Sequence, residues 1–495
     1  MNNNYRYLLA GFLIFLIILL QPVYLKWLGY DAVPASAGSV AEPSEIIVSP
    51  NSVAPEKFDK SIFVPGDKSC SIRYFFLASQ AYGLSKAKGI LESEDIFSTI
   101  KALTKLGVRI VKKNNTWFVW GNGLNSLTTK DNISIDCGNS GTLSRFILSI
   151  LSTYPQKIEV YGDHSLNKRP MDRIMNPLEK LGAFFQTKKK VKRTLPCYIT
   201  GSEMPIKIDH EEKIGSGQIK GGLILASLGC PGISTIKEFK KKQSRNHTEK
   251  MLKFAGPGII KVKKFKNYNL ISIKGQKDFK AFNLNVGGDF SSASFFILLT
   301  LLSKNSRLKI KSVNLNPTRL GALKILKKMG GKITLQNIKF QCGERIGDIT
   351  VKSSNLKSIN CPASIVPLAI DEMPLIFLAA SFANGISSFR ACGELEKKES
   401  PRLSLMNKML IQIGIRTKLK DRDSIKIYGN PNLNLNNKIY RIKTSYDHRL
   451  SMVGIVLGLT LGGKIIVEDC HSIATSFPNF LNLMKQLGAK YEIIK

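Results

Sequence analysis

The chain has 495 residues, too many for one ordinary hydrophobic core, so two or more domains are expected. A hydrophobic content of 43% with scattered charges excludes a largely disordered chain. The formal net charge of +37 leaves three anionic partners open: nucleic acid, membranes and acidic small molecules. Because lysines are spread along the whole chain, we favour solvated surfaces over a nucleic-acid footprint.

The cysteines and histidines give no sign of a metal site. None of the eight cysteines forms a C-x-x-C pair, and the five histidines show no H-x-x-x-H pair. Such spacings are typical of zinc ligands. The sequence therefore predicts no protein-bound metal and reduced, mostly buried thiols in a cytosolic protein, while a catalytic cysteine stays open.

Residues 1–60 are expected to be an N-terminal hydrophobic segment followed by a linker. Tyr7–Leu20 is continuously apolar, which is short for a membrane span of about 20 residues. The run also suits a signal peptide, with Ala35–Ala37 as a candidate cleavage site. Membrane contact is expected only if residues 7–25 are retained, and a Pro, Ser, Ala and Val-rich linker follows up to about Asp59. This opening faintly resembles the signal anchor of bacterial membrane-protein insertases.

Lys68, Ser69 and Arg73 stand at a predicted strand-to-helix turn. A strand-like segment at 61–64 precedes them, and an apolar helical run occupies 72–82. Free N–H groups and the helix dipole favour anions at such a helix start. An ordinary capped turn remains the alternative. A phosphate-binding P-loop is excluded because an aspartate separates the glycine from the lysine.

A helix-ending pattern of apolar residues followed by glycine recurs six times, and successive glycines lie 74 to 84 residues apart. Glycine is the common left-handed cap of a helix, so one copy alone is uninformative. Six copies at nearly constant spacing predict an internal repeat. The glycines are Gly107, Gly182, Gly256, Gly330, Gly414 and Gly488.

A second marker runs in phase with these glycines, because a polar cluster opens an apolar helical run about 40 residues before each of them. Six helix N-termini that meet at one place would bind a polyanion without a metal. Three units per domain would place the site between two similar halves. A repeat protein with serine-capped helices remains the alternative. The clusters are Lys68–Ser69, Gly138–Thr142, Ser216–Gln218, Gly288–Ser292, Asp371–Glu372 and Asp447–Arg449.

A set of motifs occurs in an order that resembles the 5-enolpyruvylshikimate-3-phosphate synthase family over residues 61–495. Ser244–Lys250 and Ile473–Phe480 are most similar to the class that includes glyphosate-tolerant bacterial forms. The motifs are Lys68–Arg73, Gly138–Thr142, Lys168–Met171, Ser244–Glu249, Asn316–Arg319, Ile370–Glu372, Lys398–Ser400 with Arg402, Asp447–Arg449 and Ala474–Pro478.

The resemblance implies an α/β protein, a two-domain inverse α/β barrel of six βαβαββ units with its active site in the interdomain cleft. One domain would span 67–287, and the other would combine 61–66 with 288–495. The implied reaction transfers the carboxyvinyl group of phosphoenolpyruvate to the 5-hydroxyl of shikimate 3-phosphate and releases phosphate, on the route to chorismate and aromatic amino acids. The resemblance further implies these two substrates as partners, no cofactor, no nucleic acid, a monomer and a cytoplasmic catalytic body.

The resemblance also implies roles for individual residues. Asp371 would take the hydroxyl proton, while Glu399 and Lys68 are the candidates for proton exchange at C3. Phosphoenolpyruvate would be held by Lys68, Gly141, Arg169, Gln218, Arg402 and Arg449, with Arg145 adding positive potential. Shikimate 3-phosphate would be held by Ser69, Arg73, Ser216, Gly217, Gln218, Ser244, Asp371 and Lys398.

Some positions depart from the pattern of the family. Pro401 replaces an aspartate, and Glu396 and Lys397 replace an Arg-Val pair, which puts the placement of Arg402 in doubt. Gly217 replaces a small side chain that contacts the substrate phosphate, and Thr475 stands where many relatives have a lysine. Gly141 leaves room for an inhibitor slightly larger than phosphoenolpyruvate, so glyphosate sensitivity stays open.

Three other functions are alternatives to this one. A carboxyvinyl transferase that acts on a UDP-amino sugar would share the architecture, but Asp447–Arg449 and Lys398–Glu399 argue against it. An RNA 3′-phosphate cyclase would suit the positive charge, yet no histidine stands in a context that supports nucleotide transfer. A membrane-anchored, inactive binding protein would need a broken basic cluster, and this cluster is intact in the sequence.

Overall fold

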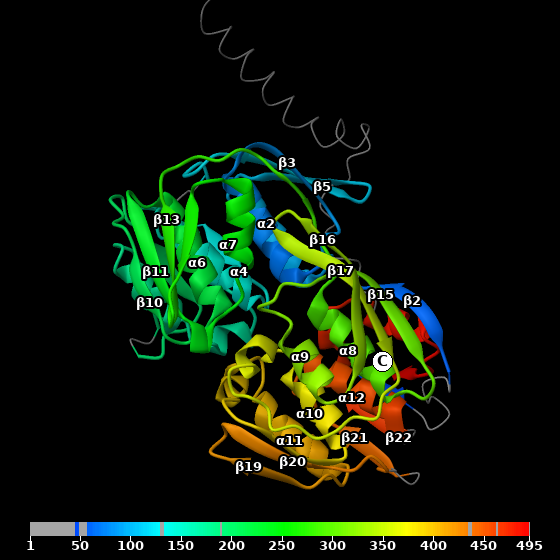
Figure 1. The fold of residues 1–495 in the computed structure, drawn as a ribbon. Helices are drawn as coiled ribbons and strands as arrows, with labels where there is room; N and C mark the ends of the chain where they lie inside the picture. The colour runs from blue at the N-terminus through cyan, green and yellow to red at the C-terminus, as the bar shows by residue number, and fades with distance from the viewer. Residues whose placement is uncertain are drawn as a thin grey trace, which may run out of the picture.

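The computed structural model describes residues 45–48, 57–128, 133–188, 191–433, 438–461 and 464–494. Strands and helices alternate along the chain and gather into two halves, one mainly blue to green and the other mainly yellow to red (Figure 1). Each half surrounds its own hydrophobic core. The predicted α/β class is confirmed.

The first half buries a core that runs from Cys70 to Leu284. Among the residues that the structure describes, its sheets have the orders β14-β3-β5-β4, β6-β7-β9-β8 and β10-β11-β13-β12. In each sheet the first two strands are parallel and the later neighbours antiparallel. The strands are β3 (Tyr82–Lys88), β4 (Arg109–Lys113), β5 (Thr116–Asn122), β6 (Ser134–Asp136), β7 (Lys157–Tyr161), β8 (Phe184–Thr187), β9 (Cys197–Thr200), β10 (Asp209–Glu212), β11 (Ile233–Phe239), β12 (Ile260–Lys264), β13 (Tyr268–Lys274) and β14 (Asn283–Asn285). The helices are α2 (Lys68–Gln80), α3 (Glu94–Lys105), α4 (Gly141–Leu151), α5 (Asp172–Glu179), α6 (Gly217–Gly229) and α7 (His247–Ala255), with 3-10 turns η2 (Leu166–Lys168) and η3 (Lys240–Lys242).

The second half buries a core that runs from Ile46 to Ala489. Its described sheets have the orders β16-β17-β15-β2, β18-β20-β19 and β21-β22-β1-β23. The strands are β1 (Glu45–Val48), β2 (Asp59–Phe63), β15 (Arg307–Asn314), β16 (Lys332–Gln341), β17 (Glu344–Lys352), β18 (Gly385–Phe389), β19 (Thr417–Lys420), β20 (Ser424–Gly429), β21 (Ile439–Ile442), β22 (Lys464–Glu468) and β23 (Glu492–Ile494). The helices are α8 (Phe290–Leu302), α9 (Gly321–Lys328), α10 (Met373–Ser381), α11 (Arg402–Gln412), α12 (His448–Leu461) and α13 (Phe480–Gln486), with 3-10 turns η4 (Val366–Ala369), η5 (Gly393–Lys397) and η6 (Cys470–Ile473).

Two strands lie in the half opposite to the helix that follows them. β2 precedes α2 in the chain, but it pairs in parallel with β15 of the second half. β14 precedes α8, but it pairs in parallel with β3 of the first half. Within the described residues from β2 onward, the chain therefore passes between the halves twice, between β2 and α2 and again between β14 and α8.

The predicted apolar helices are present as α2, α4, α6, α8, α10 and α12. Nearly every residue of α8 is buried, as expected for a helix that is apolar on all sides. Asp67, Ser140, Ser216 and Asp289 each cap a helix by accepting a backbone N–H. α10 differs, because its cap is Glu372 and Asp371 lies one residue before it.

The predicted second helix of each unit is also present, as α3, α5, α7, α9, α11 and α13. The glycines after five of these helices have a positive φ, as left-handed caps do. Gly256 is the exception, with a φ of −129°. The repeat was therefore predicted correctly, but one of its glycines has another backbone conformation.

Residues 45–48, expected to belong to a linker, instead form the strand β1. It lies between β22 and β23 and is antiparallel to both. β9 and β13 occupy the corresponding place in their own sheets, where each is the last strand of its unit. Two of its side chains, Ile46 and Val48, are fully buried. The hydrophobic segment predicted at 7–25 lies outside the described residues, and no described helix is long and apolar enough to cross a membrane.

Candidate active site

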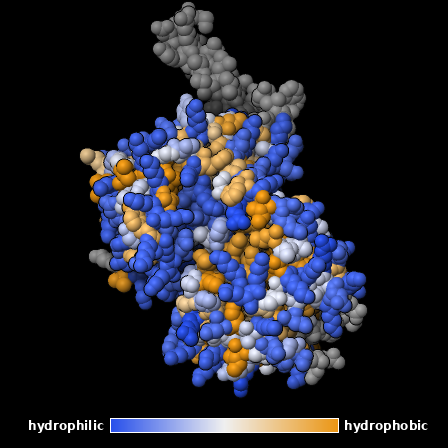
Figure 2. Space-filling view, in the orientation of Figure 1, coloured by the Kyte–Doolittle hydropathy of each residue, from blue (hydrophilic) through white to orange (hydrophobic). Residues whose placement is uncertain are grey.

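A polar cleft lies between the two halves and has a cavity volume of about 270 Å³. Its lining comes from both halves and includes many arginines and lysines. Hydrophilic residues also dominate the visible outer surface of the molecule (Figure 2). Every residue predicted to bind substrate or to move protons lines this cleft, except Arg402. Those that line it are Lys68, Ser69, Arg73, Gly141, Arg169, Ser216, Gly217, Gln218, Ser244, Asp371, Lys398, Glu399 and Arg449.

All six apolar helices contribute to the lining at or just before their first turn. Because exposed N–H groups and helix dipoles favour negative charge there, their convergence suits a polyanion. The predicted meeting of helix starts is thus present in the structure. The contributing residues are Lys68 and Ser69, Gly141 and Thr142, Gly217 and Gln218, Asp289, Asp371, and His448 and Arg449.

Asp371 lies in the cleft among cations from both halves. Its carboxylate forms a close ion pair with Arg245, and Lys398 Nζ lies 3.1 Å from its Oδ1. Burial would raise the pKa of Asp371, but these cations, with Arg449 and Arg402, outweigh burial and hold that pKa well below its usual value. The carboxylate is ionised and is a weak base while these cations contact it.

Glu399 and Lys68 lie on opposite walls of the cleft. Arg402 Nη2 lies 2.6 Å from the Glu399 carboxylate. Burial would raise the pKa of Glu399, but Arg402 and Arg169 keep it well below its usual value. Lys68 Nζ donates to Asp95 at 3.0 Å and to Ser476 at 2.6 Å, which links the first half to the loop after η6.

Arg402 lies beneath the cleft rather than in its lining. Its side chain is 1% exposed and donates from Nε to Asp447 at 2.8 Å. Ser400 Oγ donates to the same Asp447 oxygen at 2.8 Å. The arginine after Pro401 therefore starts α11 with its guanidinium held by Asp447 and Glu399, and its Nη1 lies 3.8 Å from Oδ1 of Asp371, which lines the cleft.

Among the predicted phosphoenolpyruvate ligands, Arg169 and Gln218 lie close to Gly141 at the start of α4, and Arg449 lies at the start of α12. Arg169 Nη2 donates to Asn139 Oδ1 at 2.7 Å, and Arg449 Nη1 donates to the Asp371 carbonyl at 3.1 Å. Gln218 Nε2 donates to Thr142 Oγ1 at 3.0 Å. These contacts hold the three side chains in place at the lining of the cleft.

Arg145 and Gly141 adjoin this group. Arg145 Nη1 donates to the Gly141 carbonyl at 2.7 Å, and burial lowers the pKa of Arg145 to about 10. A methyl group on Gly141 would lie 2.9 Å from Arg145 Nη1 and 3.2 Å from Arg169 Nη1. Space at Gly141 is therefore limited by two guanidinium groups.

The predicted shikimate-phosphate ligands of the first half lie on the side of the cleft formed by α2, α6 and the start of α7, whereas Asp371 and Lys398 come from the second half. Arg73 donates to Thr248 Oγ1 at 2.7 Å and to the Gly217 carbonyl at 3.1 Å, and burial lowers its pKa to about 10. Ser216 Oγ caps α6. Ser244 donates its hydroxyl proton to Glu238 at 2.9 Å.

Several cleft residues were not predicted from the sequence. Arg245 is the most important, because it pairs with Asp371 across the cleft and lies 3.5 Å from Ser69 Oγ. Its position beside the predicted Ser244 was the signal that could have identified it. Arg173 also spans the cleft and contacts both carboxylate oxygens of Glu394, at 3.1 and 3.3 Å. In the sequence, neither arginine differs from one that forms an ordinary surface ion pair.

Known proteins resemble this chain over most of its length. The profile of the EPSP synthase (3-phosphoshikimate 1-carboxyvinyltransferase) family matches residues 53–484. The 3-phosphoshikimate 1-carboxyvinyltransferase of Zymomonas mobilis is 38% identical over 435 residues, 87% of this chain and 94% of that protein. The same-named protein of Ruthia magnifica is 38% identical over 431 residues, 87% of this chain and 96% of that protein.

Solved structures agree with these relatives. The EPSP synthase of Acinetobacter baumannii is 35% identical, with a TM-score of 0.79 over 91% of this chain and 100% of that chain. The enolpyruvyl transferase NikO of Streptomyces tendae is 12% identical, with a TM-score of 0.69 over 91% of this chain and 99% of that one, and so shares the fold. Sequence and fold agree along the same stretch, and the chain belongs to the EPSP synthase (3-phosphoshikimate 1-carboxyvinyltransferase) family.

Proposed function

We propose that the protein transfers the carboxyvinyl group of phosphoenolpyruvate to the 5-hydroxyl of shikimate 3-phosphate and releases phosphate. Membership of the family supports this reaction. The observation that carries it is the cleft, where arginines, lysines and six helix starts face one small cavity. Two substrates that each bear a phosphate and a carboxylate need such a concentration of cations.

Substrates would bind on two sides of this cleft. Lys68, Arg169 and Arg449, with Gln218 and the backbone of Gly141, would hold phosphoenolpyruvate, and Arg402 would support them from below. Shikimate 3-phosphate would lie against the α2, α6 and α7 side, where its carboxylate and phosphate meet Arg73, Ser69, Ser216, Gly217 and Ser244, and where Lys398 and Asp371 reach its ring.

The chemistry needs a proton to leave the 5-hydroxyl and a proton to reach C3. Asp371 would accept the hydroxyl proton as the oxygen attacks C2, after substrate anions draw Arg245 and Lys398 away and its pKa rises. Glu399 or Lys68 would protonate C3. In the second step C3 loses a proton, the C2–O bond to phosphate breaks, and the enol ether forms.

The two cores are proposed to be domains that close on the substrates. Their proposed extents are 67–287 for one domain, and 61–66 with 288–495 for the other, in an inverse α/β barrel of six βαβαββ units. The two separate cores and the two passages of the chain between them support this division. Closure would exclude water from the charged cleft.

We also propose that the catalytic body is a cytoplasmic monomer. The substrate phosphoenolpyruvate is the reason for this location, since export would separate the enzyme from it. Cell fractionation with N-terminal sequencing of the mature protein tests the proposal. An active, exported form would contradict it.

Phosphate release that depends on both substrates tests the reaction. We expect Asp371→Asn to lower kcat by about 10² to 10⁴-fold, and Lys68→Ala to impair both kcat and phosphoenolpyruvate binding. Asp59→Asn removes an exposed carboxylate in β2 and should leave turnover unchanged. A wild-type protein that releases no phosphate from the pair, or that prefers a UDP-amino sugar as acceptor, would refute the proposal.

A further inference from the structure

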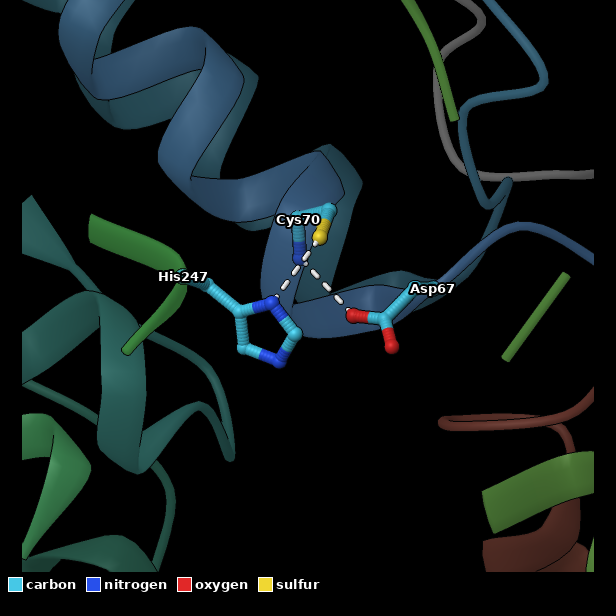
Figure 3. Close-up of side chains that lie close together, drawn as sticks. All are labelled: Asp67, Cys70 and His247. Carbon is cyan, nitrogen blue, oxygen red and sulfur yellow. Dashed lines mark hydrogen bonds between the residues drawn. The ribbon is translucent and has the colours of Figure 1, made fainter. Parts of the chain in front are cut away.

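Three buried side chains of metal-ligand type, Asp67, Cys70 and His247, gather behind the cleft with their ligand atoms within 4.8 Å of one another (Figure 3). Cys70 Sγ lies 3.4 Å from His247 Nδ1, and Asp67 Oδ1 accepts the Cys70 N–H at 2.9 Å. Burial raises the pKa of the Cys70 thiol well above its usual value. His247 Nδ1 already lies 2.7 Å from the Glu344 carboxylate. A metal would need the Cys70 thiolate and a free His247 Nδ1, but the thiol stays protonated and Glu344 contacts that nitrogen. The three side chains are therefore part of a hydrogen-bonded junction between the two halves.

Glu344 reaches this junction from the second half of the molecule. It begins β17, and its two oxygens contact two residues one helical turn apart on α7, His247 Nδ1 at 2.7 Å and Lys250 Nζ at 3.0 Å. Burial would raise the pKa of Glu344, but His247 and Lys250 outweigh burial and lower it. The Glu344 carboxylate is therefore ionised at neutral pH, and each of its two oxygens contacts one residue of α7. Asn316 Nδ2, also from the second half, lies 3.1 Å from each.

The turn between β16 and β17 lies tightly against α7. Figure 1 shows this hairpin extending from the second half toward α2 and α7. Gly343 in the turn has a φ of +80°, and a Cβ at this position would lie 2.8 Å from the Lys250 carbonyl oxygen. Only glycine suits this conformation and this close approach. Cys342 of the same turn contacts the Asn283 carbonyl of the first half at 3.4 Å.

The first turn of α7 is held mainly from outside the helix. Its cap, Asn246, makes no capping hydrogen bond with its side chain, which instead accepts from Asn316 Nδ2 at 2.9 Å. Ser244 and Arg245, which line the cleft, lie immediately before this turn. Movement of the helix start would therefore displace Arg245 and would strain the two hydrogen bonds by which Glu238 holds Ser244.

We propose that Glu344 is a positioning residue for the shikimate 3-phosphate side of the cleft. It anchors the start of α7 through His247 and Lys250, and so fixes Ser244 and Arg245 where the substrate phosphate binds. The inference rests on the proposed function, because it names the substrate of that site. The phosphoenolpyruvate side has other supports, among them the hydrogen bonds of Arg169 to Asn139 and of Arg449 to the Asp371 carbonyl.

Glu344→Gln tests this proposal with little change in shape. We expect KM for shikimate 3-phosphate to rise about tenfold, while KM for phosphoenolpyruvate and kcat stay within about twofold. Hydrogen exchange should also increase in residues 244–250, and not in α6. The matched control is Asp348→Asn on the same strand, where the carboxylate contacts Lys309, Asn337 and the Ser312 N–H, all of the second half.

Each outcome decides the question. Equal increases in both KM values, unchanged KM values, or unchanged exchange in 244–250 would overturn the positioning role. If Glu344→Gln fails to fold, Lys250→Met removes one of the two contacts at a partly exposed side chain and should give the same split on a smaller scale. A wild type without turnover would refute the proposed function, while the exchange measurement would still report on the anchor.

Discussion

His448 is buried at the start of α12 with a neutral imidazole. Burial, aided by Lys68 and Arg449 and opposed by Asp447, lowers its pKa to about 3. In an unfolded chain histidine titrates near pH 6.5, so the unfolded state binds a proton between these limits that the folded state does not. The folded protein therefore loses stability as the pH falls through this window.

We expect this group to lower the free energy of unfolding by on the order of 1–2 kcal/mol between pH 7 and pH 5. Urea denaturation at both pH values measures the change, and His448→Asn should reduce it. The lowered carboxyl pKa values of Asp371, Glu399 and Asp447 interfere little, because their contributions are lost mainly below about pH 5. An equal pH dependence in both proteins would contradict this assignment.

At the residue level, the sequence identified which residues belong to the site better than it identified how deeply each side chain is buried. Arg449 and Asp371 line the cleft as expected, because each stands beside a helix start that the repeat located, and Arg169 lines it as the Lys168–Met171 motif implies. Arg402 had the same motif support but lies beneath the cleft, bound to Asp447 and Glu399. That pairing depends on how α11 packs against the loop before α12, and a motif does not contain this information.

At the level of elements, the strand β1 also shows that sequence patterns do not reveal contacts between distant parts of the chain. The apolar helices and their following glycines were predictable, because capping and helical periodicity act between near neighbours in the chain. β1 is four residues long, and Glu45 pairs with Glu468 and Ile494. Nothing local in a Pro and Ser-rich stretch indicates partners so distant, so the sequence indicated a linker there.

The sheet β21-β22-β1-β23 should depend on β1. Val48 is fully buried against α12, where a Cβ on Gly458 would lie 2.8 Å from Val48 Cβ. We expect Val48→Asp to lower the free energy of unfolding by more than about 3 kcal/mol, since it buries an unpaired charge.

Urea denaturation measures this loss. Glu45→Gln is the control, because it removes only a surface pair with Arg441 and should cost less than about 1 kcal/mol. Similar denaturation midpoints for the two variants would show that β1 contributes little to the second core.

At the scale of the whole molecule, the two halves are joined by two chain passages and by contacts across the cleft. Arg245–Asp371 and Arg173–Glu394 are ion pairs between the halves, and both involve residues that line the cleft. Substrate anions compete with the carboxylates of these pairs for the arginines. One bound anion can also contact cations of both halves at once. Binding and closure are therefore expected to be coupled.

We expect saturating shikimate 3-phosphate to reduce the radius of gyration, as measured by small-angle X-ray scattering. Shikimate without the phosphate is the control and should produce a smaller change, because it lacks the dianion that attracts Ser244 and Arg245. An unchanged radius with saturating shikimate 3-phosphate would argue against hinge closure.

The place of β1 between β22 and β23 also has a consequence for biosynthesis. β1 leaves the ribosome among the first described residues, and its two partners are among the last. At ordinary translation rates it waits on the order of tens of seconds for them. The first core, from Cys70 to Leu284, can assemble meanwhile, but the second is completed only when the end of the chain is free. Chaperones that bind short apolar strands would find Ile46–Val48 available throughout that interval.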